Sequence, residues 1–102
     1  MRLYDDRVSS EARNDIVQLY QFLIDADTAA ADRALHAIEE GFDVLRKFPF
    51  TCRKAANGKL GPRWRELVIS FGASGYVVLF EIENHSTVTI SAVRHLREDD
   101  YY

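Results

Sequence analysis

The chain is poor in several features that mark special classes of protein. Its 102 residues include one cysteine, Cys52, so an internal disulfide is excluded. Its longest apolar runs, such as "YVVLF", are far too short to span a bilayer. The opening stretch, "MRLYDDRVSS", lacks the apolar core of a secretory signal. These absences predict one cytoplasmic domain, residues 1–102, with a single hydrophobic core and no membrane segment.

Acidic residues are missing from one part of the chain. Residues 44–65 carry seven Lys and Arg side chains and no acid, whereas residues 1–43 carry ten acids and four bases. No lysine follows Lys59, and the formal net charge is -3, which argues against an obligate nucleic-acid binder. Two interpretations of the basic segment stay open: a loop that balances acidic helices, or a docking face for an acidic partner or a phosphate backbone.

The first half of the chain has helical periodicity. A short strand is predicted at residues 3–8, after which Ser9 or Ser10 can cap a first helix and Asp27 or Thr28 a second. Apolar residues recur at spacings of three and four, which predicts an antiparallel helical hairpin over residues 10–47. The two apolar stripes are Ala12, Ile16, Leu19, Tyr20 and Leu23, and then Ala31, Ala34, Leu35, Ile38, Phe42 and Leu45.

The second half changes to a period of two after a loop that contains "NG" and "GP". "WRELVISF", "GYVVLFEIE" and "STVTISAVRH" predict three strands, and their short connectors favour an antiparallel meander. The predicted fold class is α+β, in the order β-α-α-β-β-β, with the helical hairpin packed on a mainly antiparallel sheet.

The middle strand of this meander is apolar on both faces. One row is Tyr76, Val78, Phe80 and Ile82, and the other is Val77 and Leu79. One row can pack on the helical hairpin. The other is predicted to form a bare patch that a partner covers.

The end of the last predicted strand gathers groups that could support RNA cleavage, which needs a base, an acid and cations around the phosphate. Candidates for proton transfer are Glu66, Tyr76, His95 and Tyr101, and candidate cations are Arg63, Arg65, Arg94 and Arg97. Strand alternation puts Arg94 and His95 on opposite faces, so both cannot serve one site without a bend. A catalytic set, a docking surface and a solvated tail all remain open.

Metal and thiol chemistry have little support in the sequence. His36, His85 and His95 lack the spacing of metal ligands, so neither a metal site nor a cofactor is predicted. Cys52 lies beside Arg53 and Lys54, which could lower its pKa, but no His or acid close in sequence completes a nucleophilic pair.

Several stretches, taken in order, resemble the RelE/ParE toxin superfamily of bacterial type II toxin–antitoxin modules over about residues 8–101. They are "SSEARNDIVQLYQFL", "AAADRALHAIEEGFDVLRKFP" and "RWRELVISFGASGYVVLFEIE", and "AVRHLREDDY" is similar to the His-x-Arg-Glu-x-x-Tyr ending of many ParE-like members. RelE-like members are ribosome-dependent mRNA endonucleases and usually very basic, whereas characterised ParE-like members poison DNA gyrase. The net acidic charge and the lack of lysine after Lys59 favour the ParE-like branch.

The resemblance implies a toxin that inhibits DNA gyrase and is neutralised by a ParD-like antitoxin, through which alone the complex would contact DNA. The implied target-docking residues are Arg63, Arg65, Arg94, His95, Arg97 and Tyr101. In the RelE-like alternative, the implied catalytic residues are Arg65, Arg94, His95 and Tyr101. The antitoxin is expected to cover the hairpin groove and the flank of the sheet, at Leu19, Phe22, Leu23, Arg46, Arg53, Lys54, Val77 and Leu79.

Overall fold

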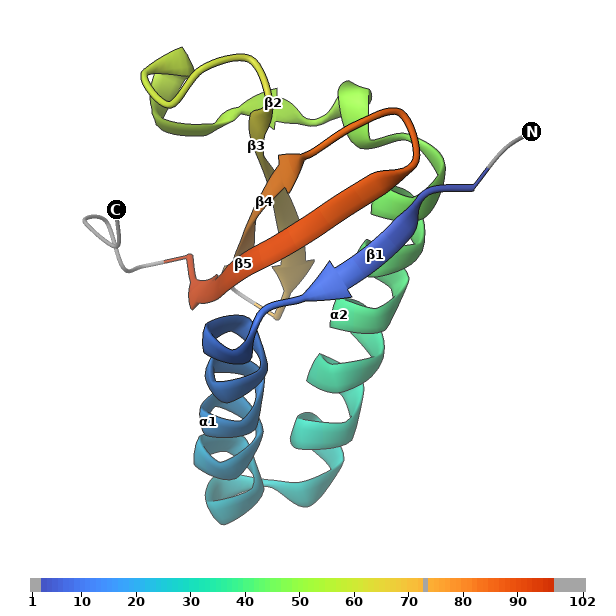
Figure 1. Ribbon diagram of the computed structural model, residues 1–102. Helices are drawn as coiled ribbons and strands as arrows, with labels where there is room; N and C mark the ends of the chain where they lie inside the picture. Colours follow the sequence, from blue (N-terminus) through green and yellow to red (C-terminus); the bar gives the residue numbers. More distant parts are fainter. Residues whose placement is uncertain (1–2, 73, 97–102) are drawn as a thin grey trace.

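The computed structural model describes residues 3–72 and 74–96 (Figure 1). The elements follow the order strand, two helices, and then strands with two short 3₁₀ turns between them. They are β1 Asp5–Val8, α1 Ser10–Ala26, α2 Thr28–Lys47, η1 Pro49–Thr51, β2 Arg53–Lys54, η2 Ala55–Gly58, β3 Trp64–Phe71, β4 Ser74–Ile82 and β5 Thr87–His95. The predicted α+β class and the order of its main elements are therefore confirmed.

Each helix begins at a polar side chain that satisfies its first backbone N–H groups. The Ser9 hydroxyl accepts a hydrogen bond from the N–H of Ala12 at 3.0 Å. The Asp27 carboxylate accepts from Ala29 at 3.0 Å and from Ala30 at 3.2 Å. Because Asp27 ends α1 and caps α2 at once, the two helices reverse direction within one residue and form the predicted hairpin.

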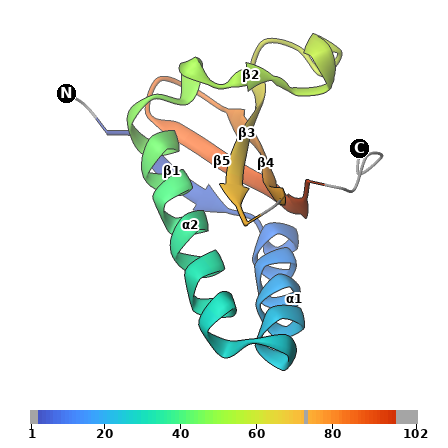
Figure 2. The same cartoon turned by 180° about the vertical axis from the view of Figure 1, so that it is seen from behind.

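The five strands form one sheet in the order β1-β5-β4-β3-β2. β1 runs parallel to β5, and the other neighbours are antiparallel, so the first strand of the chain lies beside the last. α2 crosses one face of this sheet, and it passes in front of β1 in Figure 2. α1 packs against α2 and against β5.

The core lies between α2 and the sheet. The predicted apolar row of β4 joins it: Tyr76, Val78, Phe80 and Ile82 are buried, together with Ala34, Ile38 and Leu45 from α2. Gly41 lets the helix approach the sheet closely, since a Cβ atom there would lie 2.6 Å from Cδ1 of Ile69. The helix-facing row of the middle strand was predicted correctly.

The opposite face of β4 differs from the prediction of a bare patch. Val77 is only 3% exposed and Leu79 is half-buried, so these two residues do not form an open apolar surface. Val77 lies in register between Val68 and Arg94, and Leu79 between Glu66 and Ala92, so side chains of the neighbouring strands flank both. Val68, 39% exposed, is the large apolar residue that this face does present to solvent among the strand residues described.

Two features of the sheet were not predicted. β2 is a two-residue strand that pairs Arg53 with Glu66 and Lys54 with Arg65, in a segment expected to be loop. β5 contains a bulge, because Phe80 pairs with Ile90 whereas Leu79 pairs with Ala92. The extra residue, Ser91, shifts the alternation of β5, so that both Ile90 and Val93 face the helices.

Candidate functional site

Three of the seven cations in the basic segment 44–65 contact acids or carbonyl groups of the same chain, namely Arg46, Arg53 and Arg65. A nitrogen of Arg46 lies 2.7 Å from the carboxylate of Asp6, and the other contacts Asp43. These two carboxylates raise the pKa of Arg46, Asp43 having the larger effect. Nε of Arg53 lies 2.6 Å from the buried carboxylate of Glu66 across the β2–β3 pair.

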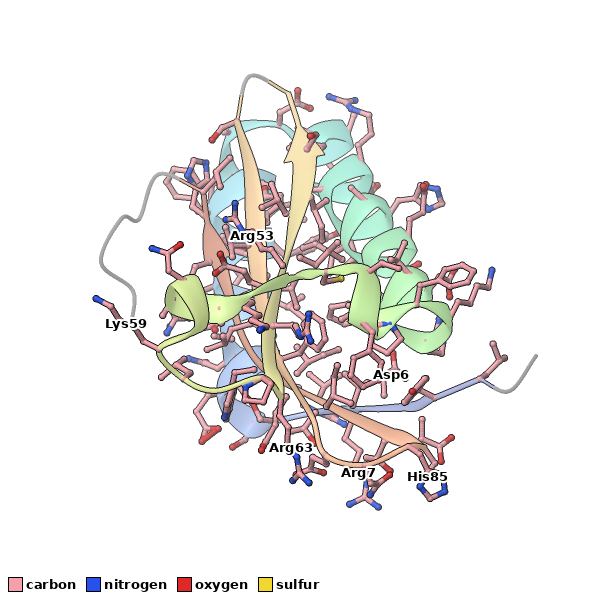
Figure 3. All side chains as sticks on the ribbon, turned by 90° about the horizontal axis from the view of Figure 1, so that it is seen from above. Asp6, Arg7, Arg53, Lys59, Arg63 and His85 are labelled. Carbon is pink, nitrogen blue, oxygen red and sulfur yellow. The ribbon has the colours of Figure 1, made fainter. Side chains whose placement is uncertain are left out.

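Lys54 and Lys59 are exposed, and Figure 3 shows Lys59 at the rim of the loop between β2 and β3. Arg46 and Arg53, which were predicted to meet antitoxin acids, are therefore already neutralised in part. The lysines are the more accessible charges.

Arg65 is held on the helix side of the sheet by backbone carbonyl groups. Its Nε donates to the carbonyl of Pro62 at 3.0 Å, and Nη1 donates to the carbonyl of Cys52 at 3.1 Å. Its guanidinium carbon lies 5.5 Å from the centre of the Phe50 ring, which is a cation–π geometry. These contacts fix the position of the guanidinium.

Cys52 is buried beneath this arrangement. Burial raises the pKa of its thiol, and this outweighs the opposite effects of a hydrogen bond with Thr51 and of the charge of Arg65. The suggestion that neighbouring cations lower the pKa of Cys52 was therefore wrong. Arg53 and Lys54 are exposed, and Arg53 pairs with Glu66.

The end of β5 carries two candidate residues on opposite faces, as strand alternation predicted. Arg94 pairs in register with Val77, and His95 with Tyr76. Arg94 forms an ion pair with Asp15 of α1. The ring of His95 meets the ring of Tyr76 edge-on, with 5.9 Å between centroids, and burial raises the pKa of the Tyr76 hydroxyl. Arg97 and Tyr101 lie outside the described residues.

The target-docking set is consequently divided between two ends of the sheet. Arg65 pairs with Phe80 and Arg94 with Val77, so they are separated along β4 and lie on opposite faces. The backbone carbonyl of Arg63 accepts a hydrogen bond from Ile82, which places Arg63 at the same end as Arg65. Arg63 and Arg65 thus lie at one end of the sheet, and Arg94 and His95 lie at the other.

A groove of 380 Å³ lies where α1 meets the end of β5, and we call it the α1–β5 groove. It is lined by Asn14, Asp15, Gln18, Leu19, Val93 and Arg94. Phe22 continues the same helical face one turn beyond Gln18, and 76% of Phe22 is exposed. Leu23 instead packs against the core between the two helices. The predicted residues Leu19, Phe22 and Arg94 therefore share one surface, whereas Leu23 does not.

Asp15 is a residue of this candidate site that sequence analysis missed. It is only 9% exposed, accepts a hydrogen bond from the backbone N–H of Val93 at 2.9 Å, and pairs with Arg94. A signal was present in the sequence, because Asp15 lies three residues after Ala12 and four before Leu19. It thus stands within the apolar stripe of α1, where an unpaired carboxylate would be costly.

The described residues contain neither a cluster of metal-binding side chains nor a membrane-spanning helix. No group of three or more His, Cys, Asp and Glu side chains that could hold a metal ion occurs within residues 3–72 and 74–96. His36 lies 2.7 Å from the carboxylate of Glu40, one helical turn away. None of the helices in the part of the chain described here has both the length and the apolar character that crossing a membrane requires.

Comparison with known proteins gives consistent matches across the chain. Residues 7–100 match the family described as "ParE toxin of type II toxin-antitoxin system, parDE". "Toxin RelE3" of Caulobacter vibrioides is 32% identical over 87 residues, covering 85% of this chain and 88% of that protein. "Toxin RelE1" of the same species is 32% identical over 88 residues, covering 86% and 88%.

A solved structure is also similar to this chain. The "Chromosomal ParDE TA system from P. aeruginosa" contains a chain that matches with a TM-score of 0.73 and 14% identity, covering 91% of this chain and 96% of that one. At this identity the likeness concerns the fold.

Proposed function

Because this chain belongs to the ParE toxin family of type II toxin–antitoxin systems, we propose that it inhibits DNA gyrase by binding it and that a ParD-like antitoxin neutralises it. The antitoxin would also supply any contact of the complex with DNA. The net charge of -3 supports this assignment, since an acidic protein is repelled by nucleic acid at long range.

The observation that carries the binding mode is the dispersal of the candidate catalytic residues. A ribonuclease needs its base, its acid and its cations around one phosphate group. Arg65 is anchored to two carbonyl groups on the helix side, whereas Arg94 occupies a strand position of the other face and is paired with Asp15 of α1. His95 packs against Tyr76. This dispersal favours binding of a partner at the end of β5 over an assembled catalytic site.

The α1–β5 groove is the surface that we assign to the antitoxin. It combines polar groups at Asn14 and Gln18 with apolar groups at Leu19 and the exposed Phe22, which suits an amphipathic partner segment. Arg94 lines the same groove. A segment bound there would cover Arg94 and keep it from gyrase, so neutralisation would follow from direct overlap of the two surfaces.

A supercoiling assay tests the target. Purified chain is added to gyrase with relaxed plasmid and ATP, and DNA products are resolved after detergent treatment. We expect loss of supercoiling together with accumulation of cleaved plasmid, and the cognate antitoxin should restore activity. If the chain arrests growth in cells but an excess of it leaves supercoiling by purified gyrase unchanged, gyrase is ruled out as the target.

A second candidate function is favoured by one observation, the identity of 32% to two proteins named as RelE toxins. If the chain cleaved mRNA, primer extension on translated messages during growth arrest should reveal codon-linked cuts that disappear with His95→Ala. Intact messages would exclude this alternative. The two assays therefore separate gyrase binding from RNA cleavage by independent readouts.

A further inference from the structure

A second concave site lies at the end of the sheet opposite to Arg94 and His95. We call it the Arg65 pocket, and its volume is 380 Å³. Its walls combine two arginines and a histidine with aromatic and aliphatic side chains, contributed by the start of β1, η1, the start of β3 and the β4–β5 turn. The lining residues that matter for recognition are Tyr4, Phe50, Arg63, Arg65, Ile82 and His85.

The central cation of this pocket is preorganised. Nε and Nη1 of Arg65 donate to the carbonyl groups of Pro62 and Cys52, which holds the guanidinium in one orientation. Within the described part of the chain, these hydrogen bonds leave the N–H groups of Nη2 for a ligand. Because the guanidinium is already ordered, a bound anion does not have to immobilise a flexible side chain.

The rim of the pocket adds two further positive or protonatable groups. Arg63 and His85 are exposed, and Figure 3 shows them along one edge of the molecule, with Arg7 between them in that view. The turn that carries His85 is fixed, because the side-chain oxygen of Asn84 accepts hydrogen bonds from the N–H and the hydroxyl of Ser86, each at 2.9 Å. The backbone of the turn that carries His85 is therefore held in place.

The nearby acids leave this positive charge largely uncompensated. The carboxylate of Asp6 forms an ion pair with Arg46 at 2.7 Å. Asp5 and Glu81 alternate with residues of the helix-facing rows and so lie on the other face of the sheet. Glu83 is exposed in the β4–β5 turn and precedes Asn84, which lines the pocket.

The pocket also offers an apolar surface beside its charge. The ring of Phe50 is 58% exposed although it carries the guanidinium of Arg65 on its face, and Tyr4 and Ile82 line the same hollow. An exposed aromatic ring next to fixed cations suits a ligand that presents an anion and an apolar group side by side.

We propose that the Arg65 pocket binds an acidic peptide segment of a partner protein, with a carboxylate between Arg63 and Arg65 and a neighbouring apolar side chain on Phe50 and Tyr4. Carboxylates match the geometry of a fixed guanidinium, and the adjoining ring accommodates the next side chain. A nucleic acid is disfavoured as the occupant, because the chain has a net charge of -3 and the cations here are confined to one small hollow. The proposal does not depend on whether the toxin acts on gyrase or on mRNA.

The test uses the full chain and a short capped peptide of alternating glutamate and leucine. Binding is followed by isothermal titration and by backbone amide shifts. We expect shifts around Arg63, Arg65 and His85, and roughly tenfold weaker binding of the matched peptide with glutamine in place of glutamate, because charge-assisted hydrogen bonds are lost. Arg63→Glu should weaken binding by a similar factor.

Lys59→Glu is the matched control, since it makes the same change of net charge at an exposed loop residue outside the pocket. It should retain at least half of the peptide affinity. If Arg63→Glu and Lys59→Glu weaken peptide binding equally, the loss reflects only the change in net charge, and the proposal is overturned. Displacement of the peptide by inorganic phosphate or by a short single-stranded RNA at equal concentration would also overturn it, because the pocket would then recognise phosphate. Neither gyrase nor antitoxin enters the test, so its outcome is independent of the proposed function.

Discussion

The carboxylate of Asp15 accepts a hydrogen bond from the backbone N–H of Val93 at 2.9 Å, although 78 positions separate them in the chain. β1 pairs with β5 only as far as Ile90, and beyond that point no strand of residues 3–72 and 74–96 lies along this edge of β5. The start of α1 lies along this edge instead. Ser9, its N-cap, donates hydrogen bonds to the carbonyl groups of Ile90 and Ser91, and Asp15 contacts Val93 and Arg94. The helix therefore fixes the part of β5 that carries the proposed gyrase-docking residues.

Replacing Asp15 should show this role in the stability of the fold. Asp15→Ala removes the acceptor of the Val93 N–H and the carboxylate with which α1 contacts Arg94, so we expect a loss of about 2–3 kcal/mol in the free energy of unfolding. Asp15→Asn keeps an acceptor oxygen and should lose about half as much. Urea denaturation measures both. Asp25→Ala, an exposed acid on the same helix, is the control, and an equal loss there would contradict the assignment.

Two glycines of the β3–β4 hairpin provide a matched pair. A Cβ atom on Gly75 would lie 2.1 Å from the carbonyl oxygen of Ile69, whereas one on Gly72 would meet nothing within 4 Å. Both have positive φ angles, so alanine at either position carries a conformational cost of roughly 1–2 kcal/mol. Gly75→Ala should lose at least about 2 kcal/mol more than Gly72→Ala, because backbone must move. Similar melting temperatures for the two variants would show that the hairpin relaxes freely.

The Cys52 thiol should be slow to react. Burial raises its pKa, so the thiolate forms only as the pH rises beyond the ordinary range of a cysteine. We expect alkylation by iodoacetamide at pH 8 to be at least roughly tenfold slower in the folded chain than in urea. The same shift implies that the stability contributed by this neutral thiol is intact below its ordinary pKa. That contribution declines as the pH passes through the raised value. Equal alkylation rates in folded and unfolded chain would show that Cys52 is accessible.

Phe22→Glu should weaken the antitoxin complex without unfolding the toxin. The side chain is 76% exposed, so the substitution leaves the core untouched, while it places a charge on the continuation of the α1–β5 groove. We expect at least a tenfold loss of antitoxin affinity, which corresponds to about 1.4 kcal/mol. Ala29→Glu adds the same charge at an exposed residue of α2 and should bind normally. If both variants bind like the unchanged chain, the antitoxin does not use this part of α1.

Local patterns in the sequence were sufficient to predict most of the fold. The caps at Ser9 and Asp27, the two helical stripes and the three long strands depend on neighbouring residues, and the structure has them where the sequence indicated. β2 escaped prediction because two residues cannot show a period. The bulge at Ser91 escaped because register depends on the partner strand.

The candidate site was harder to predict because it depends on tertiary placement. Arg65 and Arg94 are both cations of the meander, but only the register shows that they occupy opposite faces of the sheet. Val77 is likewise buried in a position between Val68 and Arg94 that composition does not reveal. Alternation alone did predict the separation of Arg94 from His95.

The parallel pairing of β1 with β5 has a consequence for biosynthesis. The second strand of the sheet in spatial order is the last to be translated, so β1 and β4 have no β5 to pair with until residues 87–95 have left the ribosomal tunnel. Until then the nascent chain can form its helical hairpin and the β3–β4 ribbon but cannot close its core. A translation product truncated before β5 would therefore lack a closed core and be open to proteolysis.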